Sequence, residues 1–105
     1  MEKPNLNYIK SLSGGDLEFE SKIIDVIKKE LPDEIKIYET FVSENGYKET
    51  AEIVHKLKHK ISILGLEKSY EIAVEFEKNL LEESKNLQKE FENILTSMTS
   101  FINLL

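Results

Sequence analysis

Residues 48–65, which read KETAEIVHKLKHKISILG, decide the fold of this chain. Apolar side chains recur in this stretch at intervals of one, three and four residues, so they fall on one stripe of a helix. The stripe consists of Ile53, Val54, Leu57, Ile61 and Leu64. Gly65 follows as a stop signal. The stretch therefore predicts an amphipathic helix over about residues 48–64 that packs one face on a core.

The opposite face of this helix carries a histidine. With Leu57 at the centre of the apolar stripe, His55 lies about 160° away, on the side that solvent reaches. Lys58 stands at the flank of that outer side. A neutral, exposed imidazole is a good nucleophile near pH 7, and a lysine one turn away can neutralise phosphate oxygens. Other polar residues on the outer side are Glu52, His59 and Ser62.

These residue types favour phosphoryl chemistry, although a lone exposed histidine is most often a solvated surface residue. Lys56, Lys58 and Lys60 lie next to the two histidines and no acid interrupts residues 54–60, so the sequence also predicts a local basic patch.

Helical spacing dominates the other segments too, and strict alternation of apolar and polar residues is scarce. We expect the apolar stripes of all segments, including Phe19, Val26 and Val74, to form the core. The predicted helices run from Leu6 to Leu12, from an N-cap at Asp16 to Leu31, from Pro32 to Val42 before Asn45-Gly46, over residues 48–64, over about 68–83 and from Leu87 to Leu105.

The fold class expected is all-α. Short connections favour antiparallel neighbours, hence an up-down-up-down four-helix bundle core with a short N-terminal helix and an additional C-terminal helix. The 105 residues have room for a single domain, residues 1–105. The last helix extends the bundle in this interpretation and the protein is a monomer; an exposed stripe there would instead offer a dimer seam.

Composition narrows the function classes. A net charge of −6 disfavours nucleic-acid binding, because a phosphate backbone would be repelled on average. No apolar run is long enough to cross a bilayer. Residues 1–4 lack the order of a secretory signal and the chain has no cysteine, so we expect a cytoplasmic protein.

The stretch around His55 resembles the signature of histidine phosphotransfer (HPt) domains. That signature is a histidine, any residue, leucine, lysine and usually glycine, with a second glycine six residues later. Here His55-Lys56-Leu57-Lys58 and Gly65 match it, and His59 replaces the first glycine. The Gly14-Gly15-Asp16 turn and Glu30-Leu31-Pro32 also resemble the family, and the likeness spans roughly residues 5–85.

The resemblance implies a four-helix bundle in which His55 is phosphorylated and Lys58 lies near the phosphate. It also implies a phosphocarrier without kinase activity, which exchanges the phosphoryl group with response-regulator receiver domains and a hybrid sensor histidine kinase. The receiver would supply Mg²⁺, so we expect no cofactor and no metal on this chain. Lys56, His59 and Ser62 are the further candidates for phosphate or partner contacts. An imidazole at position 59 partly fills the space by which a receiver approaches.

Two other functions stay open. His55 and His59 are one helical turn apart and, with Glu52, could bind zinc, nickel or copper, although neighbouring lysines would repel a cation. The chain could instead be a docking module that keeps the HPt fold without carrying phosphate. An ordinary enzyme is disfavoured, because no nucleophile–base pair, carboxylate pair or phosphate-binding glycine loop can be placed.

Overall fold

A computed structural model describes residues 2–105, and over that range the chain is all-helical with no strand. Residue 1, the first of the four residues that lack the order of a secretory signal, lies outside the described residues. The helices are α1 (Asn7–Ser13), α2 (Leu17–Ser43), α3 (Tyr47–Ile63), α4 (Glu67–Leu81) and α5 (Gln88–Ile102). None of them is long and apolar enough to cross a membrane.

Helix α2 corrects the predicted division at Pro32. Its start agrees with the sequence, because the Asp16 side chain accepts a hydrogen bond from the Phe19 backbone N–H at 3.1 Å. The helix then continues through Pro32 to Ser43, so the two segments predicted there are one helix of 27 residues. Proline is common in the first turn of a helix, but its presence does not mean that a helix begins there. Here the apolar positions on either side of it keep one helical phase: Ile24, Ile27, Leu31, Ile35, Tyr38 and Val42.

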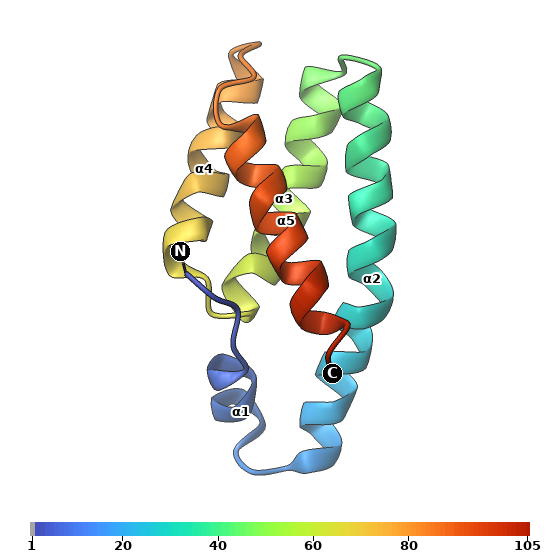
Figure 1. Cartoon of the computed structure of the whole chain (residues 1–105), viewed down its shortest axis with the longest axis vertical. Coiled ribbons are helices and arrows are strands. Elements are labelled where there is room, and N and C mark those ends of the chain that lie inside the picture. Colours follow the sequence, from blue (N-terminus) through green and yellow to red (C-terminus); the bar gives the residue numbers. More distant parts are fainter. Residues whose placement is uncertain (1) are drawn as a thin grey trace.

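The helices pack as a closed set of neighbours (Figure 1). Helix α2 contacts α3 on one side and α5 on the other, α3 contacts α4, and α4 contacts α5. Short α1 packs on α2. Tyr38, Phe76 and Phe91 form an aromatic cluster at the centre, with ring centroids 5.1–6.5 Å apart. The interior therefore joins α2, α4 and α5 directly.

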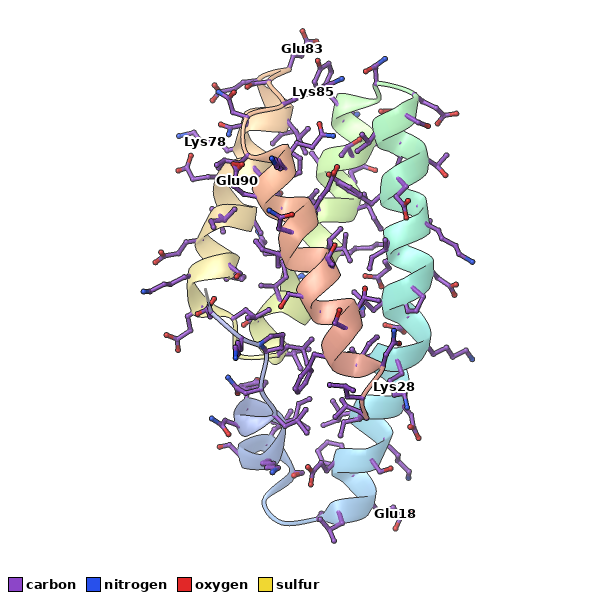
Figure 2. The ribbon with its side chains drawn as sticks, viewed as in Figure 1. Glu18, Lys28, Lys78, Glu83, Lys85 and Glu90 are labelled. Carbon is purple, nitrogen blue, oxygen red and sulfur yellow. The ribbon has the colours of Figure 1, made fainter. Side chains whose placement is uncertain are left out.

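The last helix belongs to this interior. Its apolar face is buried and consists of Phe91, Ile94, Leu95, Met98 and Ile102. The last residue also contacts α2, because the Lys28 ammonium donates a hydrogen bond to the Leu105 carbonyl at 3.0 Å. Figure 2 labels Lys28 on α2. The stripe of α5 is thus covered within the chain itself.

Several apolar residues predicted to be core are exposed. In Figure 1 the first turns of α2 project, together with α1, beyond the other helices. Phe19 and Val26, near the start of α2, are 43% and 50% exposed. At 100° per residue they lie about 120–140° around the helix from buried Leu31, off the face that packs on the core. Val74 on α4 is 40% exposed. The core prediction was wrong for these residues because they lie too far around their helices from the buried face.

Candidate functional site

The candidate site lies on the outer face of α3. The inner residues of that helix are fully buried, among them Val54, Leu57 and Ile61. His55, between them in sequence, faces outward with 54% of its side chain exposed. A partner molecule can therefore reach the imidazole without any unfolding of the helix.

A glutamate on the neighbouring helix meets both His55 and Lys58. Glu77 of α4 places Oε2 at 3.2 Å from Nδ1 of His55 and Oε1 at 2.9 Å from Nζ of Lys58. The Glu77 side chain is 21% exposed and that of Lys58 12%, so the ion pair is largely shielded from water. Lys58 also lies 5.8 Å from the centre of the Tyr70 ring. The imidazole is thereby held at one edge by a carboxylate that is itself neutralised by an ammonium group.

This arrangement sets the chemistry of the two ring nitrogens. With its proton on Nδ1, the imidazole of His55 donates a hydrogen bond to Glu77 and keeps the lone pair on Nε2. A carboxylate behind a histidine fixes the tautomer and stabilises the positive charge that forms when the other nitrogen attacks. The geometry therefore suits Nε2 of His55 for nucleophilic attack.

Sequence reasoning missed Glu77. The chain has 20 acidic residues, and nothing distinguishes Glu77 from the other glutamates of the same helix. Glu77 can be identified only from the packing of α3 against α4, the most closely associated helices of the structure. This packing places Glu77 beside His55 and Lys58.

The three lysines of residues 56–60 do not form a single patch, which corrects the sequence prediction. Lys58 turns to Glu77 on α4, whereas Lys60 turns to α2 and binds Glu30 at 3.0 Å and Glu34 at 2.8 Å. Residues two apart on a helix point in nearly opposite directions, about 160° apart. Burial disfavours the charged form of Lys60, but hydrogen bonds to Glu34 and Glu30 outweigh it and raise the pKa of this ammonium above its usual value. Only Lys56 remains exposed.

The other predicted site residues lie on the exposed side of α3. The rings of His55 and His59 stand nearly perpendicular, with centroids 5.3 Å apart. Ser62 is exposed two turns along the helix, and Glu52 is exposed one turn before His55. Over residues 2–105, no three His, Cys, Asp or Glu side chains lie close enough to hold a metal ion. The metal-binding alternative thus lacks the third ligand that Glu52 was expected to supply.

A shallow groove adjoins His55 on the side of the α3 N-terminus. It has a volume of about 290 Å³ and runs between α3 and α4. Its lining residues are Lys48, Ala51, Glu52, His55, Lys56, Glu77 and Leu81. The groove lies on the side of His55 away from His59, so the second imidazole does not obstruct it.

No family model, no curated protein and no solved structure matches this chain.

Proposed function

We propose that this protein is a histidine phosphotransfer domain that carries a phosphoryl group on Nε2 of His55. The observation that carries the proposal is the shared carboxylate of Glu77, 3.2 Å from Nδ1 of His55 and 2.9 Å from Nζ of Lys58. An accidental surface histidine has no need of a partner on the next helix. A phosphate acceptor needs an exposed nucleophilic nitrogen, a fixed tautomer and a nearby cation.

The proposed transfer is a displacement at phosphorus. Nε2 of His55 attacks the phosphorus of a receiver aspartyl phosphate, the N–P bond forms, and the P–O bond to the aspartate breaks. The aspartate leaves as a free carboxylate, and the Nδ1 proton stays between the imidazole and Glu77. The reverse reaction passes the group to another receiver. Catalysis of this kind rests on positioning and charge neutralisation.

The partner supplies much of that catalysis in this proposal. Receiver domains and a hybrid sensor kinase are the expected partners, and the Mg²⁺ that neutralises the phosphoryl oxygens would sit on the receiver. Lys58 would contribute its ammonium by moving from Glu77 toward the phosphate. Lys56, His59 and Ser62 line the exposed side of α3 along which a receiver would dock. These partners imply a cytoplasmic location.

The helix order supports the same proposal. We infer that α2, α3, α4 and α5 form an up-down-up-down four-helix bundle, with α1 as a short N-terminal addition. In this interpretation α5 is the fourth helix of the bundle and not an extra one, because the two segments around Pro32 have merged into α2. The support is that each of the four contacts its neighbours in a closed ring.

The proposal is tested by transfer from a phosphorylated receiver domain with Mg²⁺ to the full chain. We expect one acid-labile phosphoryl group per molecule by intact mass. The His55→Ala variant should gain none, and the His59→Ala variant should be labelled like the parent. Phosphoramidate, which phosphorylates histidine without a protein partner, serves as a second donor.

The two donors separate the competing functions. A folded parent protein that gains no phosphoryl group on His55 from either donor would overturn the phosphocarrier proposal. Labelling of His55→Ala at the parent level would show that another residue carries the phosphoryl group. Binding of a receiver with a measurable Kd but no transfer would instead support the docking module.

A further inference from the structure

A second groove runs between α2 and α5 and shares no lining residue with the groove at His55. Its volume is about 590 Å³, twice that of the groove at His55. Helix α5 crosses the molecule obliquely, from the side of α4 at its start to the side of α2 at its end (Figure 1). The groove follows the edge that this crossing leaves open. Its lining residues are Ile35, Tyr38, Glu39, Val42, Ser43, Gln88, Glu92, Leu95, Thr96, Thr99 and Ser100.

The floor of this α2–α5 groove is apolar and its rim carries short hydroxyl side chains. Tyr38 and Leu95 are buried, and Ile35 and Val42 pack against the core. Ser43, Thr96, Thr99 and Ser100 line it without filling it. Short side chains at a helix edge let another backbone come close, and the apolar floor gives an inserted side chain something to contact.

The groove carries negative charge without a counterion. Glu92 is half-buried, and its Oε2 accepts hydrogen bonds from the Tyr38 hydroxyl and the Gln88 amide, both at 3.0 Å. Neither Glu92 nor Glu39 forms an ion pair within residues 2–105, and no Lys, Arg or His lines the groove. Burial, together with the neighbouring carboxylate of Glu92, raises the pKa of the Tyr38 hydroxyl, so its proton stays in place. The groove at His55 differs, because Lys48 and Lys56 line it.

The length of the groove suits a short helix. From Gln88 to Ser100 the lining residues of α5 follow one side of the helix over about 18 Å, the length of roughly 12 helical residues. An amphipathic helix placed there buries an apolar stripe on the groove floor, and basic residues beside that stripe meet Glu39 and Glu92.

We propose that the α2–α5 groove docks a basic amphipathic helix of a partner protein. The groove and the face of α3 that carries His55 use different residues, so this partner can remain bound while a receiver meets His55. The docking does not depend on phosphorylation of His55.

The test uses two synthetic peptides of about 14 residues with the same helical spacing of leucines, one filled out with lysine and the other with glutamate. We expect the Leu/Lys peptide to shift backbone amide NMR signals of the groove-lining residues, and the Leu/Glu peptide to shift none of them. The Glu39→Gln/Glu92→Gln variant should bind the Leu/Lys peptide about tenfold more weakly, since two charge contacts are lost.

Glu71→Gln/Glu75→Gln on the exposed surface of α4 removes the same charge elsewhere and is the matched control. Its affinity for the Leu/Lys peptide should stay within about twofold of the parent. Equal weakening in both double variants, or signal shifts spread over the acidic surface, would show unspecific attraction and overturn the proposal. Thr96→Trp fills the groove and should abolish binding of the Leu/Lys peptide. The NMR spectrum of this variant should remain that of a folded protein.

Discussion

Nδ1 of His55 and Oε2 of Glu77 lie 3.2 Å apart across the contact between α3 and α4. The other oxygen of the same carboxylate holds Lys58, so one glutamate positions both the candidate nucleophile and the candidate phosphate-binding cation. A residue on another helix, 22 positions after His55 in the sequence, therefore organises the site.

Replacement of Glu77 tests this relationship. Glu77→Ala removes the hydrogen-bond acceptor of Nδ1, so the imidazole should populate both tautomers, visible in the ¹⁵N chemical shifts of the ring. We expect phosphoryl transfer to His55 to slow about tenfold or more, the usual scale for loss of a residue that orients a functional histidine. Glu75→Ala, on the same helix but exposed, is the control. Unchanged ring shifts in Glu77→Ala would show that the contact does not set the tautomer.

The sequence was sufficient for the outward position of His55 but not for its environment. Helical periodicity alone places Val54 and Leu57 inward and His55 outward, because the angle between residues is fixed within a helix. The partner of His55 depends on the register between α3 and α4, which no local pattern encodes. The prediction of a basic patch failed for the same reason, because Lys60 pairs with acids that precede it by about 30 residues.

The all-α class followed directly from apolar spacing, whereas the number of helices did not. Pro32 predicts a helix start, because its ring suits a first turn. The unbroken apolar phase from Ile24 to Val42 was the stronger signal, because it allows one helix to keep a single buried face through the proline. Exposure of Phe19 and Val26 follows from the same phase, because both lie about 120–140° around the helix from Leu31.

Pro32 gives a prediction about stability. A proline within a helix removes one backbone hydrogen bond, here the one that Lys28 would otherwise accept, and costs up to about 3 kcal/mol relative to alanine. Its side chain is exposed, so Pro32→Ala sacrifices little packing. We expect the variant to raise the free energy of unfolding in urea by about 1–3 kcal/mol. A loss of stability would indicate that the chain bends at Pro32 into two helices.

Lys60 gives a prediction about a shielded ion pair. Its side chain is 10% exposed and reaches Glu34, of which 16% is exposed. Lys60→Met leaves the Glu34 carboxylate without its cation, and loss of one partner of a buried pair costs about 3 kcal/mol. The double variant Lys60→Met/Glu34→Leu should regain most of that loss in urea unfolding. Equal stability of the single and double variants would mean that Glu34 is well solvated without Lys60.

The same ammonium predicts a response to alkaline pH. The pKa of Lys60 is raised in the folded state above its ordinary value of 10.5, because hydrogen bonds to Glu34 and Glu30 outweigh the effect of burial. The folded state therefore holds this proton more tightly than the unfolded state does. The resulting stabilisation is fully present below pH 10.5 and is lost as pH rises through the folded pKa. Urea unfolding between pH 9 and 12 should show a steeper loss of stability in the parent than in Lys60→Met.

Glu2 gives a prediction at acidic pH, because its side chain caps α4 from the far end of the sequence. The carboxylate accepts hydrogen bonds from the backbone N–H groups of Lys68 and Ser69 at 3.0 and 2.9 Å, at a helix whose own N-cap, Leu66, offers none. Desolvation opposes ionisation, but these hydrogen bonds outweigh it and lower the pKa of Glu2 below 4.5. The stabilisation is therefore present above pH 4.5 and is lost as pH falls through the folded pKa.

Two variants separate the cap from general acid sensitivity. Glu2→Ala should lower the free energy of unfolding at pH 7 by about 1 kcal/mol, the usual value of an N-terminal cap. Glu18→Ala removes an equally negative but exposed side chain and should change it by less than about 0.5 kcal/mol. The Glu2→Ala variant lacks the cap at every pH, whereas the parent loses it in acid. The difference in free energy of unfolding between the two proteins should therefore shrink as pH falls from 5 to 2. A difference that stays constant over this pH range would show that the charge of Glu2 does not carry the interaction.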